Sequence, residues 1–132
     1  MASVVKEIEV GISAGAAWDA IRDIGALHTR LVPGFVVDTK VEAGGVARVV
    51  AFANGMVVRE PIVALDQARL RLVWAAEGGL ATHYNGSAQV VETDAGVKVV
   101  WIADFLPHAA RDAIDAAMSA GAAAMKKALS GP

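Results

Sequence analysis

The end of the chain, residues 107–129, predicts one long helix whose apolar face consists almost entirely of small residues and methionines. Its apolar positions recur at spacings of three and four, as in one buried helical stripe: Ile114, Ala117, Met118, Gly121, Met125 and Leu129. A helix that covers a curved sheet normally fills the concave side with large side chains. This stripe therefore predicts open space between helix and sheet. A general alanine bias of the chain would also produce such a face.

Seven strand-like segments with period-two alternation precede this helix, at residues 4–12, 35–42, 46–53, 56–65, 69–77, 82–93 and 97–105. After the first strand, Ser13 is a good N-cap for a short helix. Gly25 is expected to end this helix by adopting the left-handed conformation of a C-terminal cap. A second helical turn or two covers residues 26–31. Short turns join the last six strands, which makes the sheet antiparallel with one apolar face. The order predicts an α+β fold in which the sheet wraps around the C-terminal helix.

Composition narrows the class of protein. The chain has 132 residues, of which 55 % are hydrophobic and 20 % charged, so we expect one domain, residues 1–132, with a substantial core. A net charge of −2 gives no electrostatic footprint for nucleic acid or an anionic membrane, and cysteine is absent. The first residues are strand-like rather than a signal peptide, and no apolar run is long enough for membrane insertion. We expect a soluble, cytoplasmic domain that is a monomer or homodimer.

Several short motifs, in this order, resemble those of a known superfamily over nearly the full length of the chain. They are Ala17-Trp18-Asp19, Leu31-Val32-Pro33-Gly34, Arg59-Glu60 followed by Leu65-Asp66, Arg71-Leu72-Val73-Trp74, the Tyr84 strand, and Val100-Trp101 through Phe105-Leu106-Pro107. The chain resembles the SRPBCC or START-like (birch-pollen-allergen-like) superfamily, in its polyketide cyclase/dehydrase and lipid-transport group. The resemblance implies a helix-grip fold, in which a seven-stranded antiparallel sheet grips the last helix and two short helices follow the first strand.

The same resemblance implies a cavity between sheet and helix that holds a small hydrophobic ligand. Some members are aromatase/cyclases, some carry lipids or hormones, and some bind other proteins. Plant abscisic-acid receptors have a Glu five residues before Leu-Asp and a pocket Tyr on the sixth strand, and Glu60 and Tyr84 match these positions. The loop before Tyr84 is shorter here and no equivalent of the receptors' ligand-binding Lys is found. A role as hormone receptor is therefore not supported.

Glu60 is the sharpest candidate for chemistry. It shares its strand parity with apolar residues, so it is predicted to face inward, where a carboxylate must be paired or protonated. Glu60 would have no catalytic or binding role if it lay at a solvent-exposed end of the strand or formed a purely structural ion pair. Arg48 is the partner to test: a two-residue Asn54-Gly55 turn places it on the outer face, as we expect, whereas a three-residue loop would bring it beside Glu60.

Residues of inward parity are the candidate ligand contacts. They are Phe35, Val58, Glu60, Ile62, Trp74, Tyr84, Gly86, Ala88, Trp101, Phe105, Ile114, Met118, Gly121 and Met125. Tyr84 could equally be a core tyrosine, and the tryptophans plain core. His28 could reach the cavity mouth as an acid or base, or be a solvated helix residue. The spacing of histidines gives no metal site, and no nucleotide cradle or other cofactor site is indicated.

Three functions remain open on this sequence. The first is binding of a small hydrophobic or amphipathic ligand, of the lipid, aromatic polyketide or terpenoid type. The second is a cyclase or dehydratase in which Glu60 or His28 transfers protons. The third is a protein-interaction domain that uses the outer sheet face, whose polar residues include Arg59, Arg69 and Arg71.

Overall fold

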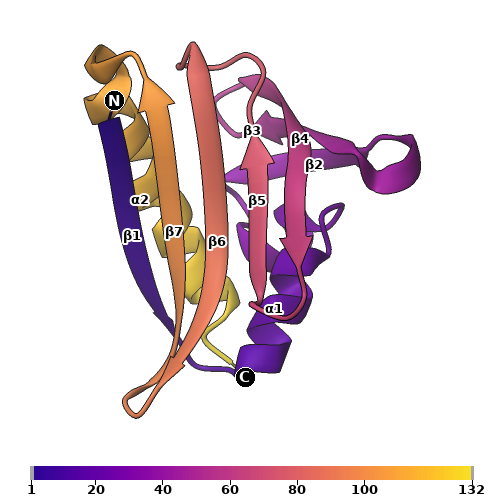
Figure 1. Ribbon diagram of the computed structural model, residues 1–132, viewed down its shortest axis with the longest axis vertical. Coiled ribbons are helices and arrows are strands. Elements are labelled where there is room, and N and C mark those ends of the chain that lie inside the picture. Colours follow the sequence, from indigo (N-terminus) through magenta and orange to yellow (C-terminus); the bar gives the residue numbers. More distant parts are fainter. Residues whose placement is uncertain (1, 132) are drawn as a thin grey trace.

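Seven strands form one antiparallel sheet that curves around the last helix (Figure 1). The computed structural model of the protein describes residues 2–131. The strands are β1 (Ala2–Val10), β2 (Val36–Val41), β3 (Ala47–Phe52), β4 (Val57–Asp66), β5 (Arg71–Ala75), β6 (His83–Thr93) and β7 (Gly96–Leu106). The helices are α1 (Ala14–Arg22), η1 (Leu27–Leu31), α2 (Arg111–Ala128) and the single turns η2 (Ala43–Gly45) and η3 (His108–Ala110). No helix in this part of the chain is long and apolar enough to cross a membrane.

The strand order in the sheet is β1-β7-β6-β5-β4-β3-β2, and every neighbouring pair is antiparallel. Strands β1, β7, β6 and β5 stand side by side, with α2 behind β1, β7 and β6, whereas β2 and β3 run across the view (Figure 1). The α+β helix-grip architecture expected from the sequence is confirmed.

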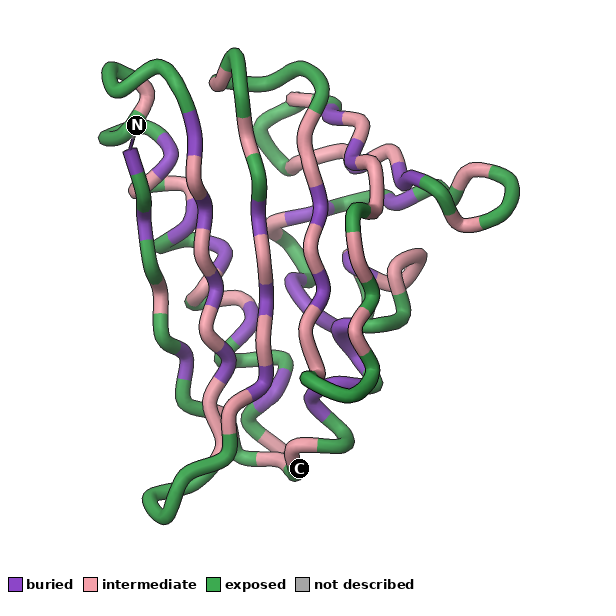
Figure 2. The backbone as a smooth tube through the Cα atoms, in the orientation of Figure 1, coloured by how far each residue is buried: buried purple, intermediate pink, exposed green. Residues whose placement is uncertain are grey.

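The core lies between the concave face of the sheet and α2. Along β7, Val99, Trp101, Ala103 and Phe105 are buried and their neighbours are less so, and Figure 2 shows this alternation on β6 and β7. The period of two comes from the pleat, which sends successive side chains to opposite faces. On α2 the buried residues are Ile114, Met118, Gly121 and Met125, so the predicted stripe faces the sheet.

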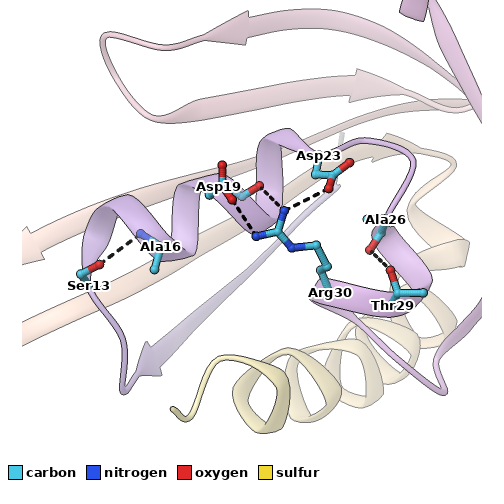
Figure 3. A network of polar contacts seen from close by, with 7 residues as sticks. All are labelled: Ser13, Ala16, Asp19, Asp23, Ala26, Thr29 and Arg30. Carbon is cyan, nitrogen blue, oxygen red and sulfur yellow. Dashed lines mark hydrogen bonds and ion pairs between the residues drawn. The ribbon is translucent and has the colours of Figure 1, made fainter. Parts of the chain in front are cut away.

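The two short helical segments are held together by an arginine (Figure 3). Arg30 of η1 donates hydrogen bonds to the carboxylates of Asp19, at 2.7 Å, and Asp23, at 3.0 Å. The guanidinium of Arg30 lowers the pKa of Asp19. At the start of α1 the hydroxyl of Ser13 accepts from the amide of Ala16 at 3.1 Å, which confirms the predicted N-cap. These contacts fix η1 against the end of α1.

Two local predictions were wrong. Helix α1 ends at Arg22 with Asp23 as its C-cap, and Gly25 does not have the positive φ of a left-handed cap. A Cβ on Gly25 would lie 2.9 Å from Cγ2 of Val41, so close packing on β2 explains the glycine. The β3–β4 hairpin has a three-residue loop rather than two, because the amide of Phe52 donates to the carbonyl of Met56 at 2.8 Å.

The longer loop changes which side chains of β3 face the core. Gly55 adopts a φ of 91°, and the amide of Met56 donates to the side chain of Asn54 at 3.0 Å. A turn with one residue in the left-handed region is a common three-residue hairpin connection. In the resulting register Arg48 lies directly opposite Glu60. The expected outward position of Arg48 was therefore wrong.

Candidate functional site

A cavity of about 350 Å³ lies between the inner face of the sheet and α2, with a lining that is mostly apolar. Its walls come from β3 to β7, from α1 and η1 at one end, and from Ala113, Ile114, Ala117, Met118 and Met125 of α2. Of the small residues of the helix stripe, Ala117 therefore borders open space. The volume is near the lower end of the range of about 300–1,000 Å³ that small-molecule pockets occupy.

Most residues that the sequence placed on the cavity wall do lie there. They are Phe35, Val58, Glu60, Trp74, Tyr84, Ala88, Trp101, Ile114, Met118 and Met125. Four others, Ile62, Gly86, Phe105 and Gly121, do not line the cavity. Parity places a residue on the correct face, but it does not show whether another side chain lies in front of it.

The two glycines are covered by tryptophan rings, whereas Phe105 and Ile62 differ from them. The indole of Trp74 covers Gly86, and a Cβ on Gly86 would lie only 2.5 Å from that ring. In the same way Trp101 covers Gly121, where a Cβ would lie 2.8 Å from the ring. Phe105 stacks on Tyr84 with ring centroids 6.4 Å apart and is fully buried. Ile62 lies at a register shift of β4.

A buried ion pair forms a polar region in the wall of the otherwise mostly apolar cavity. Nε of Arg48 donates to Oε1 of Glu60 at 2.9 Å, and the two side chains are only 3 % and 9 % exposed. Nη1 of Arg48 also donates to the carbonyl of Ile24 at 3.4 Å. The guanidinium carbon lies 5.4 Å from the ring centroid of Trp74, within cation–π range. Arg48 is thus held from three sides.

Burial changes the acid–base properties of two side chains in the cavity. Burial raises the pKa of Glu60, and the charge and hydrogen bond of Arg48 oppose this without cancelling it. Burial also raises the pKa of Tyr84, and the negative charges of Glu60 and Asp104 add to the rise. The hydroxyl of Tyr84 therefore stays protonated and remains a hydrogen-bond donor.

Two buried tryptophans differ in how their N–H groups are used. Nε1 of Trp101 is buried and has no hydrogen-bond partner within residues 2–131. In contrast, Nε1 of Trp18, outside the cavity, donates to Gln67 at 2.8 Å. Trp18 is buried between α1 and the sheet, as expected of a packing anchor.

His28 was predicted to be a possible acid or base at the cavity mouth, but it does not line the cavity. Its Nδ1 lies 3.1 Å from the hydroxyl of Thr39 on β2. Both η1 leucines, Leu27 and Leu31, line the cavity instead. In a short helical segment, neighbouring residues point in different directions, so His28 faces β2 while the leucines face inward.

Several residues of the cavity wall were not predicted from the sequence. Besides Arg48, they include Phe52 and Met56 beside the hairpin and the loop of residues 78–81 before β6. The predicted wall residues come from periodic patterns of strands and of the last helix, and loops carry no such periodicity. Phe52 contacts Phe35 edge to face at 5.4 Å between centroids, and both rings line the cavity.

The site offers no arrangement of metal ligands. Within residues 2–131, no group of three or more His, Asp or Glu side chains is placed to hold a metal ion. The chemically active groups that line the cavity are the Arg48–Glu60 pair and the Tyr84 hydroxyl.

A curved antiparallel sheet that closes on a C-terminal helix around an apolar cavity defines a helix-grip protein. A family profile described as "Polyketide cyclase / dehydrase and lipid transport" matches residues 1–131, so the chain belongs to this family. Membership supports a ligand-binding or cyclase role in general. No curated protein matches the chain.

Solved structures with the same fold share little sequence with this chain. XoxI from Bacillus cereus is 22 % identical, with a TM-score of 0.85 over 98 % of this chain and 96 % of the other. The Zhui aromatase/cyclase from Streptomyces sp. R1128 is 18 % identical, with a TM-score of 0.72 over 97 % and 90 %. The structure of Ara h 8.0201 is 16 % identical, with a TM-score of 0.72 over 97 % of each chain. At these identities the similarity establishes the fold.

Proposed function

We propose that the protein binds a small hydrophobic or amphipathic ligand, of the lipid, aromatic polyketide or terpenoid type, in the cavity between sheet and α2. The observation that supports this is the cavity itself, about 350 Å³ in volume, with aromatic walls and one buried ion pair. A mostly apolar pocket with a few fixed polar groups is typical of small-molecule sites. The partner in this proposal is neither a nucleic acid nor a membrane.

The test is to fill the cavity from the helix side. Ala117 lines the cavity, whereas its neighbour Ala116 is exposed on α2. Ala117→Phe is expected to weaken binding of the dye 1-anilinonaphthalene-8-sulfonate at least tenfold, because the new ring occupies the space. Ala116→Phe is the matched control and is expected to bind the dye like the parent protein. Equal binding by both variants, or no binding by the parent, would refute the proposal.

Native mass spectrometry of the purified protein would identify a ligand that it carries from the cell. Release of one small molecule per chain from the parent, and its loss in Ala117→Phe, is the expected result. The same spectra give the oligomeric state, which we propose to be a monomer or a homodimer. We also propose a cytoplasmic location, which fractionation of cells would test.

A cyclase or dehydratase role is the alternative, and the raised pKa of the cavity-facing Glu60 favours it. Glu60→Gln is then expected to lose turnover of the identified ligand while it still binds that ligand. His28→Gln is expected to keep turnover, because His28 does not line the cavity. Unchanged turnover in Glu60→Gln would exclude Glu60 as the proton-transfer group.

A further inference from the structure

Three cavity-lining residues lie at the same level on neighbouring segments of the sheet, and we call them a row. They are Glu60 on β4, Ala76 after β5, and Tyr84 on β6. The bridge between Arg59 and Glu77 sets Ala76 beside Glu60. On the other side, the amide of Ala76 donates to the carbonyl of Tyr84 at 3.3 Å. Glu60 and Tyr84 are thus two strand spacings apart, about 10 Å between their backbones. Since Ala76 has only a methyl group, the space between the two longer side chains stays open.

The two long side chains each have unused hydrogen-bonding capacity. Oε1 of Glu60 accepts from Arg48, but within residues 2–131 its Oε2 takes part in no hydrogen bond. In the same part of the chain the hydroxyl of Tyr84 has no hydrogen-bond partner, although the side chain stacks on Phe105. Neither oxygen is sealed in the protein interior, since within residues 2–131 the buried side-chain atom without a partner is Nε1 of Trp101. Glu60 and Tyr84 line one cavity, so an acceptor and a donor are available there to a single ligand group.

The chemistry of the pair restricts that group. It must donate to a carboxylate oxygen and accept from a phenol, and a hydroxyl group does both through one atom. A ligand carboxylate would lie next to Glu60 and be repelled, while the guanidinium of Arg48 is already engaged by Glu60 and by the carbonyl of Ile24. A ligand ammonium would find Glu60 already neutralised. A purely apolar group would leave both polar atoms without water or partner.

We propose that the ligand carries a neutral hydroxyl group that lies over Ala76, donates a hydrogen bond to Glu60 and accepts one from Tyr84. This inference rests on the proposed function, because it assigns the chemical group recognised within the same cavity. It places the polar end of the ligand at the sheet and its apolar body against α2.

Matched aromatic probes separate the two proposals. We would measure the affinity of 2-naphthol, 2-methylnaphthalene and 2-naphthoate by displacement of 1-anilinonaphthalene-8-sulfonate. The naphthol and its methyl analogue have nearly the same shape and differ in the hydroxyl group. Two hydrogen bonds, one of them to a charged acceptor, are expected to make 2-naphthol about tenfold or more tighter than 2-methylnaphthalene. The naphthoate is expected to bind more weakly than the naphthol.

Two variants and one control locate the effect. Tyr84→Phe keeps the ring and is expected to reduce the naphthol preference about fivefold or more. Ala76→Val fills the space over the row and is expected to abolish the preference. Ala75→Val adds the same two methyl groups on the next residue, which points to the opposite face of the sheet, and is expected to leave the preference unchanged.

The outcomes distinguish the two levels of inference. A naphthol preference that falls in Tyr84→Phe and Ala76→Val but not in Ala75→Val supports the hydroxyl site. Equal affinity for naphthol and methylnaphthalene overturns the hydroxyl site and leaves the proposed hydrophobic cavity standing. A parent protein that does not bind the dye, and that binds none of the three probes in a direct calorimetric titration, overturns both.

Discussion

Removing Arg48 tests the electrostatics of the cavity most directly. In Arg48→Met the carboxylate of Glu60 stays buried while it loses its hydrogen bond and its counter-charge. A hydrogen bond to a charged group contributes about 1.5–3 kcal/mol, and a desolvated cation–π contact such as that with Trp74 about 2 kcal/mol. Breaking a buried pair by removal of one partner typically costs about 3–5 kcal/mol. We therefore expect a loss of about 3–5 kcal/mol in the free energy of unfolding at pH 8.

The loss depends on pH in a definite direction. A carboxyl group whose pKa is raised on folding reduces stability as the pH rises from its ordinary value of 4.5 through its folded pKa. Arg48 opposes this rise, so its removal raises the folded pKa of Glu60 further. The window of declining stability then extends to higher pH. Arg48→Met is expected to be much closer to the parent protein at pH 4.5, where the carboxyl group is protonated in the folded state.

Urea unfolding followed by tryptophan fluorescence at pH 4.5 and pH 8 measures both effects. The double variant Arg48→Met/Glu60→Leu removes the orphaned charge and is expected to recover most of the loss at pH 8. Arg69→Met is a control, because the pair of Arg69 with Asp66 is at the surface and Arg69 is 72 % exposed. If Arg48→Met lost the same stability at both pH values, or if the double variant were no more stable than the single one, the reasoning would be refuted.

Three further predictions use the same urea assay. Gly86→Ala is expected to lose about 1–3 kcal/mol, since its Cβ would lie 2.5 Å from the Trp74 ring, and an unchanged midpoint would show that this ring moves freely. Gly55→Ala is expected to lose about 1 kcal/mol because of the φ of 91° at this turn; a more stable variant would contradict the three-residue loop. Ser13→Ala is expected to lose about 1 kcal/mol through its N-cap, whereas Ser13→Asn should be close to the parent.

Strand parity predicted most of the sheet and most of the cavity wall. It succeeded on β6 and β7 because these strands are long, regular and buried on one face only, so alternation in sequence becomes alternation in space. It also placed Glu60 on the inner face, since Val58 on the same strand shares its parity and is buried. The cavity-facing position of Tyr84 followed from the same argument.

The partner of Glu60 could not be predicted, because it depends on the length of one turn. Asn54-Gly55 is compatible with a loop of two or three residues, and each choice turns every side chain of β3 to a different face. Periodicity within β3 does not decide between them, since Val49 and Val50 are both apolar. The hydrogen bond between Phe52 and Met56 selects the longer loop, and only the folded hairpin reveals it.

The helix stripe shows why a sequence can indicate a cavity without showing its shape. Gly121 and Ala117 are both small residues of the helix stripe, yet their surroundings in the structure differ. At Gly121 the rings of Trp101 and Phe35 come so close that a Cβ would lie 2.8 Å and 3.0 Å from them, so this small residue allows tight packing. At Ala117, one turn earlier, no large side chain fills the gap and the cavity reaches the helix. Which small residue leaves space depends on the aromatic side chains of the facing strands, and these come from distant parts of the chain. A Gly121→Ala variant should therefore strain the packing, whereas Ala117→Phe should displace ligand.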